Sequence, residues 1–386
     1  MTKQLQPIAS LELLHSTCER DTETTQGRIF NDYELLNRVQ QRYSPHKRMR
    51  TCNMVPIPSK HNAIELTSSS TKGTKFHGLV RCHSRWCPLC NKIDVAVQQG
   101  MLLSAYLQMR KNGYIPFFVT FTQPRCEDIE KANTDMGYFM GLWKKAMAYK
   151  YKGKFDTKNM VVSKDYTFNL DNPSQLHHLH THNLVFVHKS MFETDQEKVT
   201  SIDALKAVNT AKFKMKGVLG RIQSFMSDMK QIWVEKTGYK ASLKGQDTKL
   251  SDGEDIISYI KKVENSDKLV WELISKAKRK THSSKTISWV GLLQRIANTH
   301  CKKAIAIYRD FLTKMKGKKN LSIGKGLKEL DIDEDIRALS KQKLNSKQDD
   351  VDEETKTYRL SSALMKMIGL YRLQGSLATM LNKSWK

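Results

Sequence analysis

Three histidines alternate along QLHHLHTHNLVFVHKS, residues 175–190 of the chain; they are His178, His180 and His182. In an extended strand every second side chain points to the same face, so the three imidazoles would line one face about 7 Å apart. Neutral imidazoles at this spacing can share one divalent metal ion. The alternative is a histidine-rich surface patch that holds no metal.

A second group of candidate ligands stands in the segment RCHSRWCPLCNK, which contains Cys82, Cys87 and Cys90. A Cys-x2-Cys pair with an intervening proline is typical of one half of a tetrahedral zinc site. The fourth ligand has to come from upstream, where Cys52 and His77 are the candidates. The alternative is a set of reduced, buried cysteines, because seven cysteines, an odd number, argue against a disulfide framework.

A third pattern concerns a tyrosine on a predicted helix. Ser251 and Glu254 form a capping-box signature, which predicts a helix over residues 252–264. On that helix Asp255, Tyr259 and Lys262 share one flank. The phenol can attack a phosphate, the ammonium can stabilise negative charge, and the carboxylate can activate water. The alternative is a half-buried tyrosine anchor with a helix-capping acid and a solvated lysine.

Strands and helices interleave around these groups, which favours an α+β domain. β-branched and aromatic residues predict strands over residues 115–122, 160–168 and 179–188. Helical periodicity predicts helices after Cys90 up to a stop at Gly113, after Cys126, and over residues 202–237.

The motifs occur in an order that resembles one enzyme family. FFVTFT, HLHTHNLVF and DIISYIKK follow the order of the three motifs of rolling-circle replication initiators. The chain resembles the plasmid Rep branch of the HUH endonucleases, in the group with a Cys-rich segment and a Tyr-x-x-Lys motif. The segment FLTKMKGKKNLSIGKGLKEL also resembles the C-terminal element of that group. The resemblance spans roughly residues 75–330.

Five positions depart from the family pattern. Leu179 replaces a proline and Thr181 an apolar residue between the histidines. Asp165 and Asp255 stand where the family often has glutamate, which keeps the carboxylate but shortens its reach. Val263 replaces the last tyrosine of the third motif.

The resemblance implies a central antiparallel sheet of the HUH nuclease type flanked by helices, with an N-terminal zinc-binding segment and a helical C-terminal part. It implies that Tyr259 nicks one strand of a plasmid origin and leaves a 5′-phosphotyrosine and a 3′-OH primer. His180 and His182 would hold Mg²⁺ or Mn²⁺, with His178 or Asp165 as a further ligand. The implied partners are origin DNA with an exposed single-stranded hairpin, a host helicase and a host polymerase, with no small-molecule substrate.

The charge of the chain agrees with a polyanionic partner. Lys and Arg number 65 against 39 Asp and Glu, a formal net charge of +26. Residues 261–330 alone hold 18 Lys and Arg and five Asp and Glu. Because basic side chains that neutralise phosphates release counterions, this region is expected to bind DNA. The basic residues expected to contact it are Lys278, Arg279, Lys280, Lys318 and Lys319.

A membrane surface competes as the anionic partner. However, no stretch approaches about 18 consecutive apolar residues, and the first residues lack the apolar core of a signal peptide. We therefore expect a cytoplasmic protein without a membrane partner.

We divide the chain into six parts, each expected from composition or from the resemblance. They are a loosely ordered arm (residues 1–75), a Cys-rich zinc segment and helix (76–112), the HUH nuclease domain (113–266), a basic helical DNA-binding region (267–337), a charged linker (338–357) and a short amphipathic helix (358–386).

Two other functions stay open at this point. One is a relaxase or transposase of the same chemistry that acts on a mobile element. The other is a non-catalytic, zinc-dependent DNA-binding repressor. Trp271 and Trp289 either stack on bases or belong to the core.

Overall fold

The computed structural model of the 386-residue chain describes most of its central part. The described residues are 36–55, 57, 64–69, 73–199, 208–209, 211, 214–250, 286–345 and 355–360. The predicted helix over residues 252–264 and the basic residues 278–280 lie outside them, as do residues 1–35 and 361–386.

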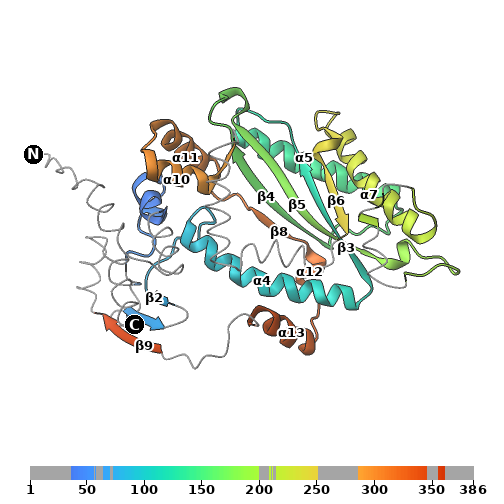
Figure 1. The fold of residues 1–386 in the computed structure, drawn as a ribbon, viewed down its shortest axis with the longest axis horizontal. Coiled ribbons are helices and arrows are strands. Elements are labelled where there is room, and N and C mark those ends of the chain that lie inside the picture. Colours follow the sequence, from blue (N-terminus) through green and yellow to red (C-terminus); the bar gives the residue numbers. More distant parts are fainter. Residues whose placement is uncertain are drawn as a thin grey trace, which may run out of the picture.

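A six-stranded antiparallel sheet forms the centre of the fold (Figure 1). Its order is β6-β3-β5-β4-β7, and β8 also pairs with β4. The predicted α+β class with a central antiparallel sheet flanked by helices is confirmed. The strands are β3 (Tyr114–Thr122), β4 (Met160–Phe168), β5 (His177–His188), β6 (Asp247–Leu250), β7 (Ile287–Ser288) and β8 (Leu321–Ile323).

The three long strands lie close to where the sequence predicts them, because each is rich in β-branched and aromatic residues. The three short strands carry two to four residues each, too few to show an alternating pattern.

Helices α5 (Ile129–Lys150) and α7 (Gly217–Lys236) cover one side of the sheet, which we call the core face. Phe121 of β3 stacks on Trp233 at a centroid distance of 4.5 Å and meets Trp143 edge-on at 5.0 Å. The Trp143 indole donates a hydrogen bond of 2.9 Å to the Met229 carbonyl oxygen. The large aromatic side chains of three elements therefore fix α5 and α7 against the sheet.

The opposite side, which we call the site face, is covered in part by α4 (Pro88–Lys111). Tyr106 of α4 packs on Phe186 of β5 in a smaller apolar cluster that also contains Leu184. The helix ends just before Gly113, whose φ of 82° provides the left-handed turn that stops a helix. This is the stop that the sequence predicts.

Helices α10 (Trp289–Thr299) and α11 (Lys302–Lys314) follow β7 and pack on the core face. Trp289 is 9% exposed and meets Trp86 edge-on at 5.9 Å. Of the two roles left open for Trp289, the structure therefore shows the core role. Helix α12 (Lys325–Lys328) follows β8, and α13 (Glu334–Asn345) packs along α4. The first part of the predicted charged linker, residues 338–345, is thus helical.

The N-terminal arm differs from its prediction as a loosely ordered segment. Residues 36–43 and α3 (Lys47–Arg50) are helical, and Leu36, Met49 and Cys52 are buried in the main core. The apolar residues here are scattered in sequence, so their common burial arises from tertiary packing that no local pattern indicates.

A separate three-stranded antiparallel sheet joins distant parts of the chain. It has the order β2-β1-β9, formed by β1 (Ile64–Ser69), β2 (Gly73–His77) and β9 (Thr355–Leu360). The last three residues of β9, 358–360, belong to the segment predicted as a C-terminal amphipathic helix, and they are extended.

Candidate active site and metal centres

The antiparallel register of β3, β5 and β4 brings the candidate metal ligands together on the site face. Asp165 lies opposite His180, and Thr120 lies opposite His182. Asp165, His180 and His182 each offer one ligand atom, and these atoms lie within 4.8 Å of one another. All three side chains are partly buried and so keep some exposure to solvent. We call these residues the histidine–aspartate group.

The Asp165 carboxylate is held by His180. Its Oδ2 lies 3.0 Å from His180 Nε2. Burial acts to raise the pKa of Asp165, but the hydrogen bond and charge of His180 outweigh it, so the pKa lies below its usual value. Asp165 is therefore an anion at neutral pH, which suits it to bind a cation.

The His182 ring is fixed by two neighbours on β3. Its Nδ1 lies 3.1 Å from the Thr120 hydroxyl oxygen. Its ring stacks on Phe118 with a centroid distance of 5.6 Å and an interplanar angle of 15°. A partner at one ring nitrogen sets the tautomer and orientation of a metal-binding histidine. In this arrangement Nε2 is the coordinating atom of a metal-bound His182.

His178 lies on the same face but outside the histidine–aspartate group. Burial lowers its pKa to about 4, and the charges of His180 and Arg125 act in the same direction. Its ring centroid lies 5.5 Å from that of His180. Two further ligands were expected. The structure brings Asp165 together with His180 and His182, whereas His178 lies next to this group and is not part of it.

The group fits a divalent metal ion. These residues could hold a metal ion, because imidazole nitrogens and carboxylate oxygens are both common metal ligands. The His180 Nδ1 atom is buried and has no hydrogen-bond partner within the described part of the chain. A buried polar atom without a partner costs free energy unless a ligand satisfies it.

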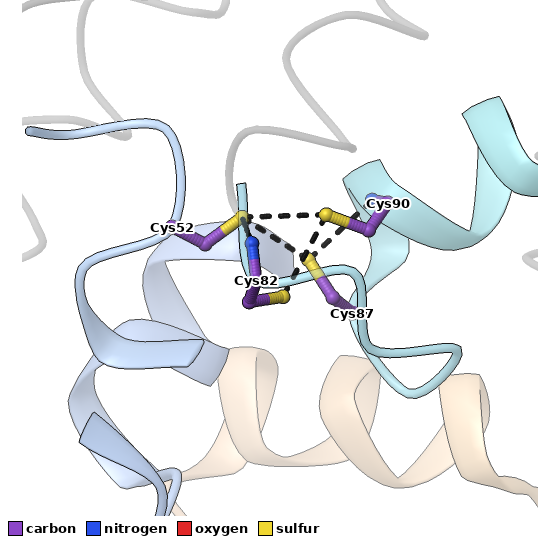
Figure 2. Close-up of side chains that lie close together, drawn as sticks. All are labelled: Cys52, Cys82, Cys87 and Cys90. Atoms are coloured by element: carbon purple, nitrogen blue, oxygen red, sulfur yellow. Dashed lines mark hydrogen bonds between the residues drawn. The ribbon is translucent and has the colours of Figure 1, made fainter. Parts of the chain in front are cut away.

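The four cysteines of the second centre lie together in the core (Figure 2). The Sγ atom of Cys52 lies 3.5 Å from that of Cys90 and 3.7 Å from that of Cys87, and the Sγ atoms of Cys82 and Cys90 are 3.6 Å apart. Four sulfurs about 2.3 Å from one Zn²⁺ would be about 3.8 Å apart in a tetrahedron. The group could hold a metal ion such as zinc, and Cys52, not His77, is its fourth member.

Local structure shapes this cysteine centre. Cys87 caps α4, and its sulfur accepts a hydrogen bond of 3.5 Å from the Cys90 backbone N–H. His83 has a φ of 53°, which turns the chain between Cys82 and Cys87. Cys82 Sγ accepts a hydrogen bond of 3.4 Å from the Ser84 backbone N–H.

The charges of the cysteine centre call for a cation. Interaction with Cys52 raises the pKa of both Cys82 and Cys87 above the usual thiol value. Four thiolates at these separations repel one another, so they coexist only around a positive ion.

Aromatic packing joins the cysteine centre to the sheet. Trp86 meets Phe311 of α11 at 4.7 Å and Tyr166 of β4 at 5.4 Å, both edge-on. The centre is therefore part of the main core and lies on the core side of β4.

Comparison with known families agrees with this arrangement. Residues 73–204 match the model of the Rep_1 family, which is described as a replication protein. This part of the chain is similar to Rep_1 replication proteins. The matched residues include three of the four cysteines and the whole histidine–aspartate group, and they support a plasmid replication initiator. No curated protein and no solved structure gives a significant match.

The remaining predicted site residues stand as follows. Tyr259, Asp255 and Lys262 lie outside the described residues, as do Lys278, Arg279 and Lys280. Lys318 and Lys319 are exposed in the turn after α11. Within the described part of the chain, no helix is long and apolar enough to cross a membrane.

Sequence reasoning missed Thr120 and Phe118, which contact the His182 ring. The two β3 residues could have been found from the predicted antiparallel pairing of β3 with the histidine strand.

Proposed function

We propose that this protein initiates rolling-circle replication of a plasmid by nicking one strand of its origin. The observation that carries the proposal is the histidine–aspartate group, built on neighbouring strands of the segment that is similar to Rep_1 replication proteins. The proposed nucleophile is Tyr259, which follows strand β6 in sequence.

The distance between the end of β6 and the histidines supports this assignment of Tyr259. Strand β6 ends at Leu250, which pairs with Phe117 on β3, three residues along that strand from Thr120. Leu250 is thus roughly 14 Å from His182, two strand spacings across and three residues along. Nine residues of helix span about 13 Å. The helix that the sequence predicts over residues 252–264 is thus long enough for Tyr259 to lie at this distance from Leu250.

In the proposed reaction the Tyr259 oxygen forms a bond to phosphorus, and the bond between phosphorus and the 3′-oxygen breaks. The phenol loses its proton and the departing 3′-oxygen takes one up to become the 3′-OH primer. Lys262 stabilises the phenolate before attack. Asp165, His180 and His182 would hold a Mg²⁺ or Mn²⁺ ion, which when bound supplies positive charge at the scissile phosphate.

The cysteine centre is assigned a structural role with zinc as its metal. It is buried among aromatic residues on the core side of β4, where no substrate has access. The basic region that includes α11 and the turn after it would bind the origin duplex.

Strand cleavage by purified protein tests the proposal. A pool of single-stranded oligonucleotides with a randomised core is incubated with and without Mn²⁺ and resolved on a denaturing gel. We expect Mn²⁺-dependent cleavage of a sequence subset, lost in His180→Ala. The matched control is His188→Ala, because His188 lies at the far end of the same strand and bonds Ser190 at 2.7 Å. DNA binding without cleavage by wild-type protein would instead indicate a repressor.

A further inference from the structure

The ladder between β3 and β5 contains an extra residue just beyond β3. Gln123 donates its N–H to the Leu179 carbonyl at 3.2 Å, and Cys126 exchanges two backbone hydrogen bonds with His177, at 2.9 and 2.8 Å. Two residues therefore lie opposite the single residue His178. Two residues facing one is the pattern of a β-bulge, which bends a strand and redirects a side chain.

The two bulge residues are Pro124 and Arg125. Proline has no N–H to contribute to a ladder, so it is well placed in a bulge. Without the extra residue, strict alternation from Thr122 on the site face would turn residue 125 to the core face. With the extra residue, Cys126 lies opposite His177, so alternation back from Cys126 places Arg125 on the site face, the face of His178.

One nitrogen of the Arg125 guanidinium is an unsatisfied donor at this place. The Nη1 atom is buried and has no hydrogen-bond partner among the described residues. Arginine stays protonated, so the group carries both a buried donor and a positive charge. A guanidinium in this condition is suited to an anion with paired oxygens, and phosphate is the common case.

Neither His178 nor Asp165 neutralises the charge of Arg125. An imidazole carries no negative charge in either protonation state, so His178 cannot neutralise Arg125. The Asp165 carboxylate is engaged with His180. Arg125 thus lies opposite His178, two residues along β5 from His180.

We propose that Arg125, displaced onto the site face by the β-bulge, binds a backbone phosphate of the single strand next to the one that is cut. This rests on the proposed function for the identity of the strand. The contact would set the register of the strand, so that the scissile phosphate lies at the histidine–aspartate group. Arg125 is in this sense a substrate-positioning residue.

The test measures binding of a fluorescein-labelled (dT)30 to full-length protein by anisotropy at several salt concentrations, without added Mg²⁺ or Mn²⁺. Arg125→Gln should bind about tenfold more weakly, because a charge-assisted bond is lost. Its log–log salt slope should fall by about 0.7, the value for one phosphate of single-stranded DNA. Arg125→Lys keeps the charge, so the slope should stay while the affinity falls.

The control is Lys145→Gln, which removes an exposed cation from the far side of α5 and should leave affinity and slope unchanged. If the log–log salt slope of Arg125→Gln equals that of the wild-type protein, the proposal is overturned. If that variant fails to fold, Arg125→Lys decides: wild-type affinity at an unchanged melting temperature overturns the proposal, and weaker binding supports it. If wild-type protein binds (dT)30 and cuts no DNA, the proposed function fails while the slope comparison still decides on Arg125.

Discussion

Asp165 and Tyr166 are consecutive residues of β4 that serve the two candidate metal centres from opposite faces of the sheet. The Asp165 carboxylate lies 3.0 Å from His180 Nε2 on the site face. The Tyr166 ring packs on Trp86, 5.4 Å away between centroids, on the core face. Trp86 directly precedes Cys87 in the cysteine centre. The packing that fixes one centre therefore also fixes the strand that presents a ligand of the other.

The Thr120 hydroxyl should matter for metal affinity although it is no ligand. Thr120→Val removes the bond of 3.1 Å to His182 Nδ1 and leaves the shape of the side chain nearly unchanged. Loss of such an outer partner weakens metal binding by about 10–100-fold. Titration calorimetry with Mn²⁺ measures the metal affinity of the wild-type protein and the variants. Thr134→Val, on the exposed side of α5, is the control, and equal Mn²⁺ affinities for the two variants would refute the role of Thr120.

Cys52 should be needed for both metal content and folding. Cys52→Ser leaves three thiols and should reduce bound zinc from one equivalent to well below one, with a lower melting temperature, because binding energy at a structural site is folding energy. Cys126→Ser is the matched control, since Cys126 is a half-buried free cysteine outside the centre. Elemental analysis and thermal unfolding are the measurements. Wild-type protein purified without zinc would contradict the assignment.

Gly324 should tolerate no side chain. Its N–H donates to the Met160 carbonyl at 2.8 Å, and an added Cβ would overlap the Lys158 carbonyl oxygen. Gly324→Ala must therefore move β8 away from β4, and we expect a loss of at least about 2 kcal/mol in the free energy of unfolding. Gly141→Ala, in open space on α5, should instead gain about 0.5–1 kcal/mol. Urea unfolding measures the free energy of unfolding of both variants. Equal values would show that the contact of β8 with β4 contributes little to stability.

Stability should fall as the pH falls below 6.5, in part because of His177. This side chain is 1% exposed, and burial lowers its pKa to about 4. Between pH 6.5 and 4 the unfolded chain binds a proton that the folded chain excludes, so stability rises with pH in this window. The full effect is about 3 kcal/mol. His177→Gln should flatten the melting temperature between pH 7 and 4.5, and an unchanged slope would remove His177 as a cause.

The sequence predicts the parts of the site that depend on local pattern. The long strands follow from their β-branched and aromatic residues, and the shared face of His180 and His182 follows from alternation. The fourth cysteine ligand could not be decided, because Cys52 reaches the centre through tertiary packing of helices whose apolar residues show no clear period. The Arg125 position depends on one extra residue in a ladder, and a register shift of one residue leaves no mark in composition.

The most direct test of the account is to map the covalent bond that the proposed reaction leaves. Wild-type protein is incubated with Mn²⁺ and a cleaved single-stranded oligonucleotide, digested with protease and nuclease, and analysed by mass spectrometry. We predict a nucleotide joined through its 5′-phosphate to the peptide that contains Tyr259. This adduct should be absent when Mn²⁺ is left out, and absent in the Tyr259→Phe and His182→Ala variants. A DNA adduct on another residue, or cleavage by Tyr259→Phe at the wild-type rate, would contradict the account.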